Sequence, residues 1–152
     1  MNGGWAVVAV GVGLLAWALY ADLAHDSEDR LARWLVPTTL RWGRGCGVAA
    51  FVISLVFLAT YGAAAWVGAV LAEALGDPRW SLLVLGPAML AYTPLVFAMA
   101  PVEPQGYRYW RESLRKAGAQ AGADRWIAWL GGVPAFVGLL ALVMTPFLIF
   151  LI

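Results

Sequence analysis

The sequence predicts an all-α integral membrane protein with four transmembrane helices. Three observations support this: four long apolar runs, the absence of Asp, Glu, Lys and Arg from all of them, and a hydrophobic content of 62%. A helix rises about 1.5 Å per residue, so runs of 18 to 26 residues extend about 27 to 39 Å and can cross a ~30 Å hydrocarbon core. The runs are continuous and do not alternate, which disfavours a β-barrel. We expect one membrane domain over residues 1–152.

The predicted spans cover residues 3–20, 47–72, 80–100 and 131–152. They are connected by two long loops, 21–46 and 101–130, and by one short outer turn, 73–79. No Lys or Arg precedes the first run, so we expect it to be a retained span and not a cleaved signal peptide.

Positive charge is distributed unevenly between the two sides of this topology. The two long loops hold nine of the ten Lys and Arg residues, and the other side holds only Arg79. Cytoplasmic loops carry the excess of Lys and Arg in membrane proteins. The sequence therefore predicts a cell membrane (plasma or inner) location, with cytoplasmic long loops and both termini outside.

The second and fourth runs resemble each other. Residues 47–60 (GVAAFVISLVFLAT) and 132–145 (GVPAFVGLLALVMT) agree at seven of fourteen positions. The first and third runs agree less well but in the same order. We therefore predict two tandem helical hairpins, with a possible parallel internal repeat.

The first long loop is predicted to contain a short amphipathic helix. Asp26 and Asp29 are expected to cap it, and Pro37 is expected to end it. Together with the neighbouring Asp22 and Glu28, these acids are expected to cap the helix and to offset nearby Arg charge.

The second long loop predicts a stronger amphipathic helix. Tyr107, Trp110 and Leu114 share one face, which we expect to lie on the membrane as an interfacial helix. The basic residues beside it are candidate contacts for an anionic lipid headgroup: Arg108, Arg111, Arg115 and Lys116. The simpler interpretation is a solvated basic loop.

Small residues recur at a spacing of four in two runs. They are Ala64, Gly68 and Ala72 in the second run, and Ala9 and Gly13 in the first. Such residues let helix backbones approach closely in lipid. They predict either packing within the bundle or a face for a partner subunit.

Prolines interrupt the third and fourth runs. A proline removes a backbone donor and tends to kink a helix, and broken helices can form binding sites near the membrane midplane. The candidate kink or cavity residues are Pro87, Tyr92, Thr93, Pro94 and Pro134. A purely structural kink is the more common case.

The composition offers few residues that could catalyse a reaction or bind a metal or cofactor. His25 is the single histidine and Cys46 the single cysteine, so a haem, a histidine metal site or an internal disulfide is not expected. The net charge of +1 gives no case for nucleic acid. We expect no catalytic, cofactor-binding or metal-binding residues, and no enzyme.

These observations favour a non-catalytic accessory or assembly subunit that packs against a larger integral membrane complex. Its expected partners are membrane lipids and either other membrane subunits or a second copy of itself. One alternative is a small oligomeric transporter or channel for a neutral or anionic solute. A weaker alternative is a lipid- or quinone-interacting subunit of a membrane enzyme.

Overall fold

The computed structural model describes residues 3–100 and 104–151, and the regular elements within these ranges are all helical. Four helices are long and apolar enough to cross a membrane. They are α1 (Gly3–His25), α3 (Cys46–Leu75), α4 (Leu82–Met99) and α6 (Ala123–Leu151). The prediction of an all-α chain with four candidate membrane-spanning helices, as in a multi-pass membrane protein, is confirmed.

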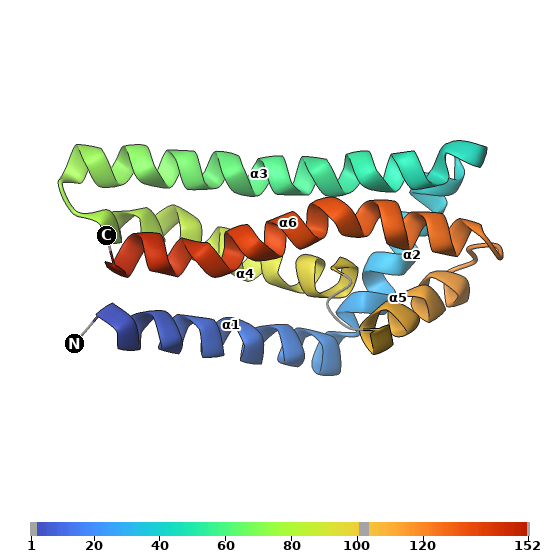
Figure 1. The fold of residues 1–152 in the computed structure, drawn as a ribbon, viewed down its shortest axis with the longest axis horizontal. Coiled ribbons are helices and arrows are strands. Elements are labelled where there is room, and N and C mark those ends of the chain that lie inside the picture. Colours follow the sequence, from blue (N-terminus) through green and yellow to red (C-terminus); the bar gives the residue numbers. More distant parts are fainter. Residues whose placement is uncertain (1–2, 101–103, 152) are drawn as a thin grey trace.

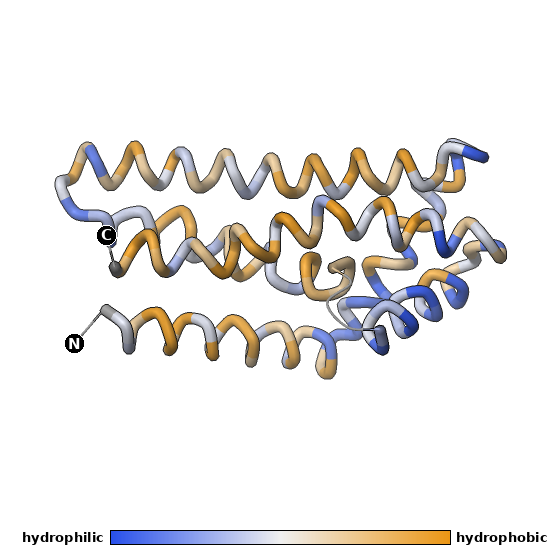
Figure 2. The backbone as a smooth tube through the Cα atoms, in the orientation of Figure 1, coloured by the Kyte–Doolittle hydropathy of each residue, from blue (hydrophilic) through white to orange (hydrophobic). Residues whose placement is uncertain are grey.

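Two shorter helices, α2 (Ser27–Leu40) and α5 (Pro104–Lys116), lie together at one end of the bundle (Figure 1). The start of α1 and the end of α6 lie at the other end. Short 3₁₀ turns, η1 (Gly43–Gly45) and η2 (Pro78–Ser81), precede α3 and α4. Hydrophilic residues gather around α2 and α5, whereas the long helices are mainly hydrophobic (Figure 2). This separation suits a chain whose long helices lie in an apolar slab.

Helix α6 is the centre of the bundle. It packs along α3 and also contacts α4 and α1. Helix α1 packs on α4 and α6 and lies on the far side of α6 from α3 (Figure 1). The first two predicted spans are therefore separated by α6, and the tandem hairpins remain a prediction.

Two glycines allow α3 and α6 to approach closely. A Cβ at Gly47 would lie 3.1 Å from the backbone oxygen of Trp126 and 2.8 Å from Cδ1 of Leu130. A Cβ at Gly131 would lie 3.4 Å from Cβ of Ala50. Without side chains at these positions, the two backbones pack directly, as small residues allow in membrane helices.

Three helices extend beyond their predicted spans, and α3 does so by one residue at its start and three at its end. Helix α1 continues past residue 20 to His25, and α6 begins at Ala123, before residue 131. The early start of α6 follows from Gly122, whose φ of 100° ends the preceding turn. Asp124 in the first helical turn favours a helix start electrostatically.

The prediction that Pro37 ends the first loop helix is wrong. Helix α2 continues through Pro37 to Leu40, and the Asp26 side chain makes no capping hydrogen bond. The hydroxyls of Thr38 and Thr39 donate to the carbonyls of Trp34 and Leu35, at 2.8 and 2.9 Å. Both bonds lie beside Pro37, but the carbonyl that loses its backbone donor to this proline is that of Arg33.

Candidate functional site

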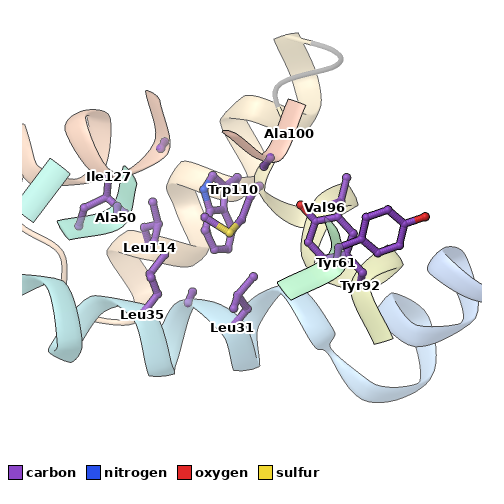
Figure 3. Packing of buried hydrophobic residues seen from close by; sticks show 14 of the residues in the cluster. Leu31, Leu35, Ala50, Tyr61, Tyr92, Val96, Ala100, Trp110, Leu114 and Ile127 are labelled. Atoms are coloured by element: carbon purple, nitrogen blue, oxygen red, sulfur yellow. The ribbon is translucent and has the colours of Figure 1, made fainter. Parts of the chain in front are cut away.

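The shorter helices and the start of α6 form a packed unit, which we call the head (α2, α5 and residues 123–128). Its core joins Leu31 and Leu35 of α2 to Trp110 and Leu114 of α5, with Ile127 of α6 beside them (Figure 3). Trp110 is 2% exposed and Leu114 is fully buried. The face of α5 that we predicted to lie on lipid is thus largely covered by protein.

A buried carboxylate holds the head together. Asp124 is fully buried, and its Oδ2 accepts hydrogen bonds from Arg111 Nε at 3.0 Å and Arg115 Nε at 2.8 Å. Arg111 Nη2 lies 2.9 Å from the same oxygen. Oδ1 accepts from the backbone N–H of Gly122 at 3.0 Å. Two of the four predicted lipid-contact residues are therefore paired with an acid of the chain itself.

The other two basic candidates lie apart from this pair. Lys116 Nζ lies 3.7 Å from the Glu112 carboxylate, and both side chains are exposed. Arg108 is exposed and has no carboxylate within 4.0 Å among the described residues. The predicted lipid-headgroup contact remains a prediction, but the four side chains do not share one environment.

The head contains an acidic hollow. We call it the acidic cleft; its volume is 450 Å³, and it lies where α1, α2, α4 and α5 meet. Five carboxylates line it: Asp22, Asp26, Glu28, Asp29 and Glu112. Lys116 is the one cation among its lining residues. The sequence predicts capping and offsetting of Arg charge for the first four acids, yet among the described residues none of these four makes an ion pair.

Glu28 is the group in this cleft whose ionisation is most perturbed. Burial, followed by the negative charge of Asp22, raises the pKa of its carboxyl to about 7. Asp29 acts in the same direction, while the Ser113 hydroxyl, which donates to Glu28 at 3.3 Å, and Lys116 oppose it. A carboxyl that titrates near neutral pH in a cleft is typical of a functional position.

The described residues place no group of three His, Cys, Asp or Glu side chains where it could hold a metal ion. No known protein family, curated protein or solved structure matches this chain.

Two tyrosines fill the membrane-spanning bundle near the predicted cavity residues. The rings of Tyr61 and Tyr92 stack at 4.9 Å (Figure 3). The Tyr61 hydroxyl shares a 2.7 Å hydrogen bond with Thr145. The buried Tyr92 hydroxyl has no partner among the described residues and packs against the backbone at Gly138. Tyr92 therefore packs within the chain, between Tyr61 and Gly138.

Pro94 has a specific structural role in joining α1 to α4. Its ring nitrogen cannot donate to the carbonyl of Leu90, one turn earlier. The indole Nε1 of Trp17 on α1 donates to that carbonyl at 2.8 Å. Because a carbonyl left unpaired in an apolar environment is costly, this bond docks α1 on α4 at the proline.

Exchanging Trp17 for Phe is expected to destabilise the protein by about 1 kcal/mol, because the Leu90 carbonyl loses its donor. In a Pro94→Ala background the new backbone N–H can reach Leu90, so the same exchange should cost less. A double-mutant cycle of unfolding free energies in detergent measures this coupling. Strictly additive costs would contradict the assigned role of Pro94.

The remaining candidate cavity residues lie in different surroundings. Thr93 donates to the carbonyl of Met89 at 2.6 Å, Pro134 is buried within α6, and Pro87 is exposed. Pro94 lines a 120 Å³ hollow against α1.

Sequence reasoning missed the acidic cleft. Four acids within residues 22–29 were a visible signal, directly after an apolar run. The contribution of α5 was not visible, because Glu112, Ser113 and Lys116 reach the cleft only through the packing of α5 on α2.

Proposed function

We propose that this chain is a non-catalytic multi-pass membrane protein that acts as an accessory or assembly subunit beside a larger integral membrane protein. The observation that carries the proposal is the uncovered small-residue face of α1. Ala9 and Gly13 are both exposed, and a Cβ at Gly13 would meet nothing within 4 Å. Helix α1 is also the least buried of the four long helices.

The predicted packing face of α3 serves as the comparison. Gly68 is buried, and its Cβ would lie 3.2 Å from the backbone oxygen of Ser81 and 3.4 Å from Cγ of Leu85. Ala64 and Ala72 are half-buried on the same helix. These small residues support packing within the chain, whereas those of α1 support a contact with a transmembrane helix of another protein.

Replacing Gly13 by Leu is expected to leave the fold intact and to abolish association with the partner. Leucine is a better helix former than glycine and meets no neighbour here, but it separates helix backbones that approach closely. Native mass spectrometry after gentle extraction from the native membrane measures the outcome. Wild type should give one discrete heteromeric mass, and Gly13→Leu the free chain.

Gly62 provides the matched control, because it lies exposed on α3 with nothing within 4 Å of its Cβ. Gly62→Leu should keep the heteromeric mass. A wild-type protein that is found only as a monomer or homo-oligomer contradicts the accessory role. If Gly13→Leu and Gly62→Leu changed the heteromeric mass equally, α1 would not be the surface that contacts the partner.

For the orientation, we propose that the head faces the cytoplasm of the cell membrane and that both termini face outward. The excess of Lys and Arg at the head end supports this, since the opposite end carries only Arg79. Exposed Trp34, Trp42 and Trp126 near the head suit the membrane interface. We also propose that the two halves of the chain arose by duplication of one hairpin, on the resemblance between residues 47–60 and 132–145.

A further inference from the structure

Three hollows follow one another along the inner side of α1, and together we call them the path. The acidic cleft shares Asp22, Glu28, Phe97 and Ala98 with a narrow neck of 120 Å³. The neck shares Leu15 and Phe97 with a groove of 260 Å³ between α1, α4 and α6. Because each hollow shares lining residues with the next, the three lie in a row from the head to the membrane-spanning part of the bundle.

The groove is apolar throughout. Its lining consists of Val, Leu, Phe, Pro and Gly residues, with Leu14, Phe97 and Phe147 among the large side chains. Gly11 contributes an open stretch of wall, since a Cβ there would meet nothing within 4 Å. A hydrocarbon chain is the chemical group that such a lining accommodates.

The other end of the path favours a cation. Five carboxylates line the cleft against one lysine, and that lysine already lies 3.7 Å from Glu112. Asp22 and Glu28 line both the cleft and the neck, so they stand where the charged and apolar parts meet. Opposite charge at this junction would complement a single positive headgroup attached to an apolar chain.

We propose that this path binds a small amphiphile with a cationic nitrogen headgroup, which lies between Asp22 and Glu28 while its alkyl chain extends along the groove. The groove supplies the apolar contact and the cleft supplies charge complementarity. This site does not depend on the accessory role proposed above, because its lining comes from one chain. It also differs from the predicted lipid-headgroup contact at Arg108–Lys116, which would take an anion.

Binding of such a ligand should depend on pH through Glu28. The charged or titratable groups that line the cleft around it come from three places: Asp22 from α1 and Asp26 from the turn after it, Asp29 from α2, and Tyr109, Glu112 and Lys116 from α5. Helix α4 adds only the uncharged Phe97 and Ala98 to the cleft. A cation favours the ionised carboxylate, so binding weakens as the pH falls through the pKa of Glu28 at about 7 and reaches its maximum above it.

The test uses the full chain in phosphatidylcholine nanodiscs with radiolabelled dodecyltrimethylammonium, whose charge does not change with pH. We expect saturable binding of one probe per chain above the background of empty nanodiscs. Binding should be about tenfold weaker at pH 6 than at pH 8, because Glu28 is mostly protonated at pH 6 and mostly ionised at pH 8. Competition by dodecyl maltoside, which has the same chain and a neutral headgroup, should be at least about tenfold less effective.

Variants assign the binding to the path. Asp22→Asn with Glu28→Gln should weaken binding about tenfold or more, and Glu28→Gln alone should remove the pH dependence. Gly11→Leu should weaken binding by filling the groove. Glu73→Gln changes an exposed acid near the end of α3 that lies away from the head, and it should leave binding unchanged. The proposal is overturned by unsaturable binding, by equal competition from dodecyl maltoside, or by equal loss in Glu73→Gln.

Discussion

Replacing Asp124 by alanine is expected to destabilise the protein by about 2–3 kcal/mol. The change removes a fully buried carboxylate and leaves Arg111, Arg115 and the Gly122 N–H without their common acceptor. Arg111 is 22% exposed, so its charge would remain largely desolvated. Arg115 is 55% exposed and can turn toward water, which keeps the cost below that of a fully buried pair.

The free energy of unfolding in detergent, followed by circular dichroism, measures this effect. The exposed pair of Lys116 and Glu112 is the matched control, and Glu112→Ala should change the stability by less than about 0.5 kcal/mol. A similar small value for Asp124→Ala would show that the buried carboxylate does not hold α5 to α6.

Replacing Gly138 by alanine is expected to cost about 2 kcal/mol through overpacking. The added Cβ would overlap the hydroxyl of Tyr92 and lie 2.8 Å from its Cζ and 3.0 Å from its Cε1. The Tyr92 ring cannot move away freely, because it is buried and stacked on Tyr61. Thermal unfolding in detergent should show a lowered midpoint.

Tyr92→Phe should partly rescue Gly138→Ala, since it removes the atom nearest to the new methyl group. Alone, Tyr92→Phe should be nearly neutral, because the deleted hydroxyl is buried and has no partner among the described residues. The pair therefore predicts a favourable coupling energy in a double-mutant cycle. The absence of rescue would place the clash elsewhere than at the hydroxyl.

The four long helices could be predicted because the membrane constrains composition locally. A span must be apolar over its whole length, so the limits of 47–72 and 80–100 were visible in the sequence and lie close to those of α3 and α4. The predicted start of α6, at residue 131, is too late because the first turns of this helix are not apolar. Its first two turns belong to the head, where Asp124 and Arg125 carry charge within a helix.

The contacts between distant segments could not be predicted. Arg111 and Arg115 share a face at a spacing of four, but their acid follows two turns at Gly118 and Gly122, with φ of 102° and 100°. These glycines return the chain so that α6 meets α5. The bond from Trp17 to the Leu90 carbonyl is equally long-range, and only the proline at 94 was a hint of it.

The position of α1 also required the structure. Two tandem hairpins suggest that the first two spans would be neighbours, yet α6 separates them (Figure 1). As a result, α1 has one side on α4 and α6 and another side, at Ala9 and Gly13, that the chain itself leaves open. The inner side holds the proposed amphiphile path and the outer side the proposed partner contact.

The measurement that tests the accessory role most directly is photo-crosslinking in intact cells from a photoreactive residue at position 13, with position 62 as the matched site. The role predicts one discrete adduct from position 13 with an integral membrane protein larger than this chain, and no such adduct from position 62. Adducts from position 13 that contain only lipid or a second copy of the chain would contradict it.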